Sequence, residues 1–172
     1  MTIPKYSKPP KIQGQGEIII NAPVSAVWPL IRDSKRLEEW GPPVQKIEVY
    51  PNGNQSQEDV GSKRKVFAKF TEKRKGWYNE IRTEQIEGRK VTFLIYEDSF
   101  GMGKMLTDVG ASMEILSEGT DKTKFIFTFY HRTKNLLGWL MNPMIKADQK
   151  KSRLKALESI KSYVEKGIAL KN

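Results

Sequence analysis

The stretch NAPVSAVWPLIRDSKRLEEWGPP, residues 21–43, decides how this chain folds. Its apolar spacing predicts a helix over residues 24–31 and a second helix over residues 34–40, ended by the following Gly-Pro-Pro. Helices this short are marginal in water when isolated. The rest of the chain must therefore supply a surface on which they pack, and we expect Trp28 and Trp40 to be their buried anchors.

Strand-like alternation flanks this helical stretch on both sides. The turns between successive strands are short and rich in glycine and polar residues, so consecutive strands are expected to pair antiparallel. About seven strands are predicted, within residues 16–23, 44–50, 61–70, 77–88, 91–98, 105–116 and 123–132.

The last segment changes its hydrophobic period from two to that of a helix. Residues 136–166 are predicted to form one long helix, with Gly167 as its C-cap. Its apolar positions are Leu140, Met144, Ala147, Leu154, Leu157, Ile160 and Val164. The predicted fold class is α+β, a curved antiparallel sheet wrapped around a long C-terminal helix.

Composition and Pro/Lys content divide the 172 residues into three parts. Residues 1–11 are predicted to be a flexible basic arm, residues 12–167 a single domain, and residues 168–172 a C-terminal tail. The two short helices after the first strand would close one end of the space between the sheet and the long helix.

Four motifs resemble the START-like and birch-pollen-allergen-like (SRPBCC) superfamily. They are INAPVSAVWPLIRDSKRLEEWGPPV (20–44), VGSKRKV (60–66), GTDKTKFIF (119–127) and LLGWLMNPMIKADQKKSRLKALESIKSYVE (136–165). The last is similar to the polyketide cyclase/dehydrase and lipid-transport-like branch. The resemblance covers roughly residues 16–167 and implies a helix-grip fold. It leaves function open, because the superfamily includes ligand carriers, lipid binders, cyclases and regulators.

Composition and charge give further expectations about the location and the partners of the protein. The chain has no cysteine, and its N-terminus carries no apolar signal segment, so the cytoplasm is the expected location. Net charge is +10. Residues 139–172 alone hold eight bases against three acids, which suits either an anionic partner or a solvated helix face. Nucleic-acid binding is disfavoured, because the basic residues form no recognisable reading motif.

Catalytic and metal-binding constellations are scarce. The single histidine, His131, is interpreted as a surface residue at the end of the last strand. One histidine without cysteine predicts no metal site, and no cofactor is expected. The GMGKM sequence at 101–105 lacks the full phosphate-loop spacing and joins two strands, so it is interpreted as a hairpin loop. The family resemblance implies that such a loop can gate the mouth of a cavity.

A cavity between the sheet and the long helix is the expected ligand site, and no catalytic residue is assigned. The alternation of Arg64 with Val66 and Ala68 allows an inward guanidinium that would hold the polar end of a ligand, or a strand-end arginine that reaches water. The predicted ligand-binding residues are Arg64, Trp77, Asn79, Ile81, Phe100, Met102, Thr107, Val109, Ala111, Met113, Phe127, Phe129 and Met144.

The function predicted from these features is binding or transport of a small hydrophobic or amphipathic ligand, lipid-like or polyketide-like. Two alternatives stay open: a polyketide cyclase/dehydratase-type enzyme, and a regulatory protein-interaction domain of the same fold. Peripheral membrane contact through NLLGWLMNPMIK, residues 135–146, is a further alternative. The sequence does not identify the ligand, the oligomeric state or a partner of the basic helix.

Overall fold

The computed structural model describes residues 11–50 and 56–171 of the chain. Its strands form one seven-stranded antiparallel sheet in the order β1-β7-β6-β5-β4-β3-β2. The strands are β1 (Ile12–Ile20), β2 (Val44–Tyr50), β3 (Lys63–Thr71), β4 (Arg74–Ile86), β5 (Lys90–Asp98), β6 (Leu106–Ser117) and β7 (Thr123–Thr133). The helical elements are α1 (Val24–Arg32), α2 (Leu37–Trp40), the 3-10 turn η1 (Met102–Lys104) and α3 (Leu136–Lys166). This is the helix-grip α+β fold that the sequence predicts.

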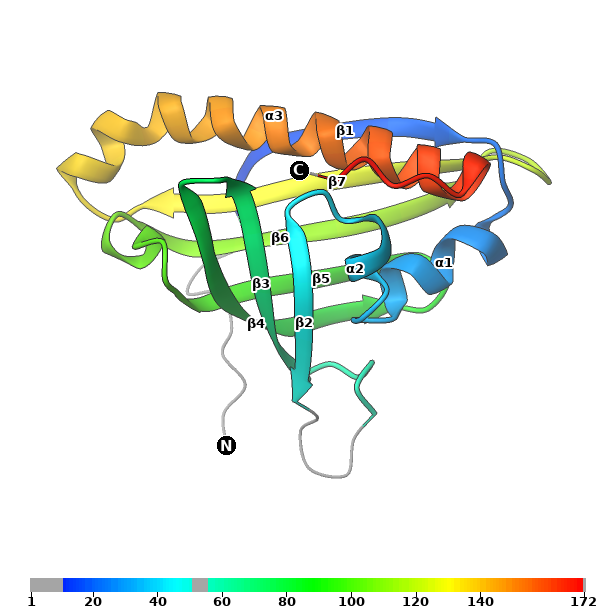
Figure 1. Cartoon of the computed structure of the whole chain (residues 1–172), viewed down its shortest axis with the longest axis horizontal. Coiled ribbons are helices and arrows are strands. Elements are labelled where there is room, and N and C mark those ends of the chain that lie inside the picture. Colours follow the sequence, from blue (N-terminus) through cyan, green and yellow to red (C-terminus); the bar gives the residue numbers. More distant parts are fainter. Residues whose placement is uncertain (1–10, 51–55, 172) are drawn as a thin grey trace.

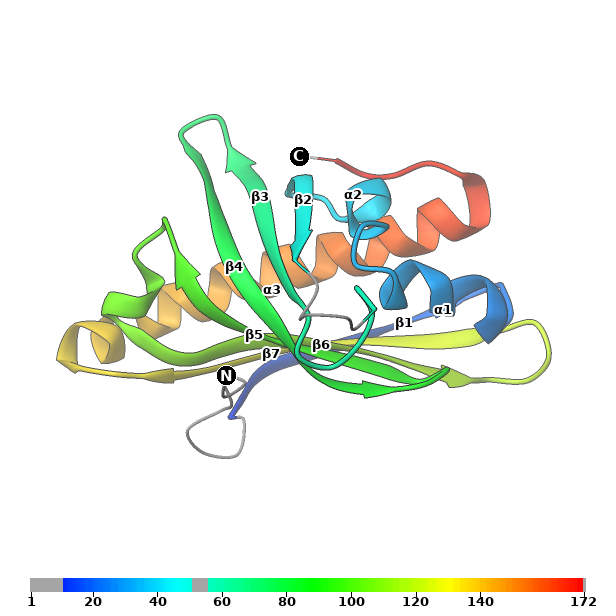
Figure 2. The same ribbon diagram turned by 90° about the horizontal axis from the view of Figure 1, so that it is seen from below.

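The sheet is strongly bent, and α3 lies along the part of it made by β1 and β7 (Figure 1). The turned view shows β2, β3 and β4 rising out of the plane of β1, β7 and β6 (Figure 2). Helices α1 and α2 lie near the C-terminal end of α3, and the first turns of α3 lie at the opposite end of the molecule. Of the predicted basic arm, residues 1–10 lie outside the described residues.

The core forms where α1, α2 and the C-terminal half of α3 cover the sheet. Trp28 and Trp40 are 8% and 1% exposed, so the prediction that they are buried anchors is confirmed. The Trp40 indole N–H donates to the Leu30 carbonyl at 3.0 Å, and its ring meets Phe125 edge-on. The Trp40 carbonyl accepts from the Ser159 hydroxyl of α3 at 2.7 Å. The short helices are therefore held by tertiary contacts rather than by their own propensity.

Both ends of α3 are set by local side-chain and backbone chemistry. Asn135 caps the first turn through its side-chain oxygen, which accepts from the Gly138 backbone N–H at 2.9 Å. A Cβ at Gly138 would lie 2.2 Å from the Met105 carbonyl oxygen, so only glycine lets this turn pack on the η1 loop. Gly167, at φ 70°, ends the helix in the left-handed conformation, which confirms the predicted C-cap.

Candidate ligand-binding site

The concave face of the sheet is fully packed toward the C-terminal half of α3 and only partly packed toward its N-terminal half. Cross-strand pairing places Phe93, Ala111 and Phe129 side by side on β5, β6 and β7. The rings of Phe127 and Phe129 lie 4.9 Å apart. Both rings and Ala111 are half-buried, whereas Phe125 is fully buried. We call Ala111, Phe127 and Phe129 the open apolar face.

Opposite β7, the β3–β4 hairpin and the segment before η1 bound the concave side. Phe70 of β3 meets Phe100 edge-on, with ring centroids 5.5 Å apart. The Arg74 guanidinium lies 5.1 Å from the Phe70 ring centroid and pairs with Asp148 of α3 at 3.1 Å. Because α3 lies on β1 and β7, this exposed ion pair connects the two sides of the curved sheet across its concave face.

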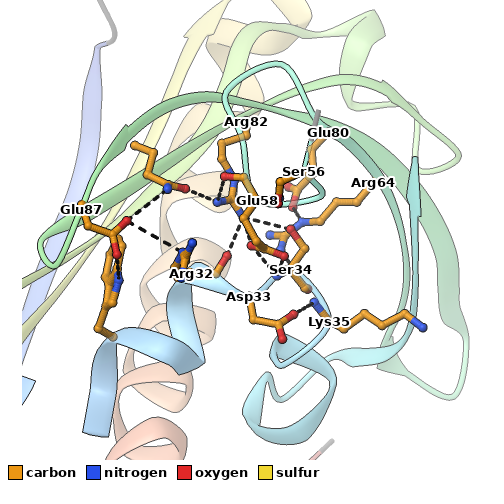
Figure 3. Close-up of polar contacts among 12 residues, drawn as sticks. Arg32, Asp33, Ser34, Lys35, Ser56, Glu58, Arg64, Glu80, Arg82 and Glu87 are labelled. Carbon is orange, nitrogen blue, oxygen red and sulfur yellow. Dashed lines mark hydrogen bonds and ion pairs between the residues drawn. The ribbon is translucent and has the colours of Figure 1, made fainter. Parts of the chain in front are cut away.

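A buried pair of charges lies on the same face, beneath the turn between α1 and α2 (Figure 3). The Arg64 Nε donates to the Glu80 carboxylate, and both side chains are almost fully buried. Arg64 Nη1 donates to the Ser34 carbonyl at 3.1 Å, and the guanidinium carbon lies 3.8 Å from the Phe93 ring centroid. Arg64 is therefore inward, as one reading of the sequence allowed, but its charge is already compensated inside the protein.

Arg82 continues this cluster and ties two loops to β4 (Figure 3). It is 0% exposed, pairs with the Glu58 carboxylate at 2.8 Å, and donates to the Arg32 carbonyl at 2.6 Å and to the Ser34 hydroxyl at 3.0 Å. Burial lowers the pKa of Arg82, and the Glu58 carboxylate acts against that shift. Arginine stays protonated even so, and the cluster locks the α1–α2 turn and the segment before β3 onto the sheet.

His131 is buried between β7 and α3, so its interpretation as a surface residue is wrong. Its Nε2 lies 2.8 Å from Asn142 Oδ1, and Gln149 Nε2 lies 3.2 Å from its Nδ1. Burial lowers the pKa of His131; Lys146 and Lys11 act in the same direction, and the hydrogen bond to Asn142 opposes it. At neutral pH the ring is therefore mostly in its neutral form. Because Asn142 Oδ1 can only accept, that form donates from Nε2, and Nδ1 accepts from the glutamine amide.

Arg153 of α3 is a buried arginine for which the described residues supply no carboxylate. It is 8% exposed and forms no hydrogen bond or ion pair within the described part of the chain, and its Nε is fully enclosed. Its side chain lies on β1, where a Cβ at Gly14 would be 2.3 Å from Nη1 and a Cβ at Gly16 would be 3.0 Å from Nε. Those two glycines pair with Phe129 and Phe127, so the guanidinium borders the open apolar face.

Two surface hollows stand out in the described residues, and neither is lined by a predicted ligand-binding residue. The larger, about 560 Å³, lies at the start of α1 beside the β4–β5 and β6–β7 turns. The smaller, about 320 Å³, lies beside the Arg82 cluster and is lined by Trp28, Pro29, Arg32, Asp33, Arg36 and Glu58. These two hollows therefore lie away from the space under α3, where the open apolar face is.

Cross-strand register corrects the predicted orientation of part of β4. Trp77 pairs with Phe67, and Asn79 pairs with Lys65, opposite to the face that carries Arg64. The Lys65 ammonium lies 4.1 Å from the Trp77 ring centroid. The expectation that Trp77 and Asn79 face the helix is therefore wrong. Trp77 and Ile81 lie on the outer face of this strand, and its inner face carries Tyr78 together with the charged Glu80 and Arg82.

The other predicted ligand-binding residues divide in the same way. Ile81 pairs with Lys63 on the outer face, and Thr107 is exposed and pairs with Arg132. Met144 is 55% exposed and belongs to the solvent side of α3. Phe100 and Met102 are half-buried near η1, Val109 is half-buried in β6, and Met113 is buried in the core. The structure brings together Ala111, Met113, Phe127 and Phe129, with Arg64 under the helical turn.

Sequence reasoning missed Phe93, Glu80, Arg82, Gln149 and Arg153. For Arg153 a signal was present, because Gln149, Arg153 and Leu157 follow each other at four-residue spacing and share a helix face with the apolar Ile160. A basic residue within the covering face of a helix indicates a buried charge. No comparable signal marked Glu80 or Arg82, because charged residues that alternate along a strand normally face water.

Comparison with known proteins gives one family and a consistent set of folds. The family model described as "Polyketide cyclase / dehydrase and lipid transport" matches residues 11–165. A START superfamily protein from Mycobacterium smegmatis superposes with a TM-score of 0.71 at 13% identity, covering 90% of this chain and 98% of its own. The Zhui aromatase/cyclase from a Streptomyces species reaches 0.70 at 13% identity, covering 88% and 92%.

Truncated norcoclaurine synthase from Thalictrum flavum is also similar, with a TM-score of 0.69 at 16% identity over 95% of this chain and 99% of its own. None of the curated protein sequences matches the chain significantly. At these identities the structural likeness concerns the fold alone, and the relatives named here differ in activity.

Proposed function

Because the chain belongs to the polyketide cyclase/dehydrase and lipid transport family, we propose that it binds a small amphipathic ligand against the open apolar face, as a carrier rather than as an enzyme. The observation that carries this proposal is the half-buried state of Ala111, Phe127 and Phe129 on the helix-facing side of the sheet. Large apolar side chains in such a position are normally covered by the core. A bound hydrocarbon or ring system would cover them.

Arg153 is the proposed contact for the polar end of the ligand. A buried guanidinium without an anion is unfavourable, and a carboxylate or phosphate beside it would supply the missing charge. Arg64 suits this role less well, because Glu80 already compensates its charge. A ligand with its acidic group at Arg153 would place its apolar part beside Phe127 and Phe129, which pair with the two glycines under the guanidinium.

A carrier is favoured over a cyclase-type enzyme by the state of the polar groups near this face. Both ring nitrogens of His131 are engaged with α3, so the imidazole is not free to act as an acid or base. Glu80 and Glu58 are committed to buried arginines. A cyclisation would require a free acid or base at the open apolar face.

The test is a titration with fatty acids, phospholipids and aromatic polyketides, read by native mass spectrometry and competition with a fluorescent fatty acid. Ala111→Trp fills the open apolar face and should abolish binding. Thr107→Trp adds the same side chain to an exposed position of the same strand and serves as the matched control. Thermal melting of both variants checks that each is folded, and Ala111→Met replaces Ala111→Trp if the latter does not fold.

Two results would overturn the proposal. One is a parent protein that binds no member of the panel below about 1 mM. The other is a folded Ala111 variant that binds as well as the Thr107 control. The role of Arg153 is tested with the variant Arg153→Met, which should weaken the binding of a fatty acid more than the binding of the corresponding fatty alcohol. If the affinities for both ligands fall by the same factor, Arg153 contributes only packing.

A further inference from the structure

The first half of α3 exposes large apolar side chains to solvent. Leu136 is 71% exposed, Trp139 64%, Leu140 60% and Met144 55%. Single exposed apolar residues are ordinary, but a group on one helix is a mark of an interaction surface. The first turns of α3 lie at the end of the molecule remote from α1 and α2 (Figure 1).

The exposed residues form a stripe along the outer side of the helix. Spacings of three, four and seven residues place positions 136, 140, 143, 147 and 154 on one helix face, and all five are exposed. We call these positions, with Trp139 and Met144, the outer stripe. It is about 27 Å long from position 136 to position 154, at 1.5 Å per residue. The opposite side of the helix packs on β1 and β7, so this helix is apolar on two sides and has a partner on only one.

Positive charge accompanies the outer stripe. Residues 136–157 contain five basic residues and one acidic residue, Asp148, which is paired with Arg74. Lys146, Lys150 and Lys151 are exposed and lie within or next to the stripe. Apolar residues with a tryptophan, bordered by lysines, are the composition of helices that lie in the interface of an anionic membrane.

We infer that the outer stripe docks the protein on the surface of a bilayer that contains anionic lipids, with α3 parallel to the membrane plane. Leu136, Trp139 and Leu140 enter the interfacial region, and the lysines contact lipid phosphates. Within the described residues no helix is long and apolar enough to cross a membrane, so the contact is peripheral. A second copy of the chain fits this surface less well, because it would bring the same lysines together.

This inference does not rest on the ligand-binding proposal. The outer stripe is on the solvent side of α3, whereas the open apolar face is on the sheet, beneath the opposite side of the helix. A protein that binds no small ligand can still dock on vesicles, and a protein that carries a ligand can do so without a membrane. A negative result in the vesicle-binding experiment therefore leaves the ligand-binding proposal standing, and a negative ligand titration leaves the membrane inference standing.

The experiment is co-sedimentation of the full chain with phosphatidylcholine vesicles, with and without phosphatidylglycerol. The parent should bind the anionic vesicles, and added salt should release much of it. The triple variant Leu136→Ser, Trp139→Ser and Leu140→Ser should bind the vesicles at least about tenfold more weakly. Each substitution removes apolar surface that would otherwise be buried in the membrane interface. Its thermal melt should match the parent, since all three residues are exposed.

The contribution of the lysines to membrane binding is tested with separate variants. Lys150→Gln with Lys151→Gln should weaken binding by roughly fivefold per lysine. The matched control is Lys73→Gln with Lys122→Gln, which removes the same charge from the exposed β3–β4 and β6–β7 turns. If the control weakens binding equally, net charge rather than the outer stripe explains the attraction, and the inference fails.

Two further outcomes would overturn it. One is a parent protein that does not sediment with anionic vesicles at low salt. The other is a concentration-dependent dimer, measured by light scattering, that the triple serine variant abolishes, because a second copy would then be the occupant. Trp139 fluorescence reports directly on entry of the side chain into the membrane interface. The Trp139 emission spectrum, obtained as the difference between the parent and Trp139→Phe, should shift to the blue when anionic vesicles are added.

Discussion

Mild acid should destabilise this protein through one buried imidazole. His131 is the only histidine of the chain and is 0% exposed. Burial lowers its pKa below the ordinary value of 6.5, and the nearby Lys146 and Lys11 act in the same direction. In the unfolded chain the ring takes up a proton as the pH falls through its ordinary pKa, whereas the native ring does so only at lower pH.

The sign and size of the effect follow from this difference. Between the two pKa values the unfolded state binds more protons than the native state, so the free energy of unfolding decreases as the pH is lowered. The slope is at most about 1.4 kcal/mol per pH unit for one proton. The contribution is fully present above the unfolded pKa and is lost progressively below it. Carboxylates with lowered pKa values, such as Glu39 and Glu165, act at lower pH.

Urea unfolding at a series of pH values measures this slope, and His131→Gln is the comparison. Glutamine cannot take up the proton but can hydrogen-bond Asn142 and Gln149. The variant should be less stable than the parent by about 1–3 kcal/mol above neutrality, because the new amide matches the two partners imperfectly. The gap should then narrow in mild acid. A parent slope equal to that of the variant, or an imidazole that titrates at its ordinary pKa by NMR, would refute the reasoning.

Two further predictions concern the core. Trp40→Ala should lower the free energy of unfolding by about 3–5 kcal/mol, because it leaves a cavity against Phe125 and an unpaired Leu30 carbonyl; a thermal melt within a degree or so of the parent would contradict it. Arg64→Met should cost about 3–5 kcal/mol, because Glu80 is left as an unpaired buried charge. The double variant Arg64→Met with Glu80→Leu should recover most of that loss in urea unfolding. Losses of the two single variants that simply add in the double variant would show that Arg64 and Glu80 are not coupled, and would contradict this prediction.

Much of the architecture was readable because local patterns carry it. Alternation marked the strands, and the change of period marked α3 together with its Gly167 cap. The short helices with Trp28 and Trp40 followed from the Pro-bounded stretch at 21–43, although α2 begins at Leu37 rather than at residue 34. These features depend on neighbours within a few residues, where backbone geometry and side-chain spacing act directly.

The candidate site was less predictable, because it depends on which side of each strand faces inward. Alternation along β4 defines two faces but does not say which of them meets the helix. Pairing with β3 places Arg64 and Glu80 on the inner side and Trp77 on the outer side. The positions of the apolar residues along β4 therefore did not indicate which face of the strand meets the helix, because its inner face holds a compensated ion pair.

Burial of the remaining polar residues was also decided only by tertiary structure. Nothing near His131 in the sequence indicates that Asn142 and Gln149 will enclose it. Arg153 is buried because two glycines on a strand more than a hundred residues earlier leave room for its side chain. The sequence by itself determined the elements and their order, because those arise from short-range periodicity and turn chemistry. Which side chains meet, and which charges lose contact with water, was decided by the register and curvature of the folded sheet, because these bring distant residues together.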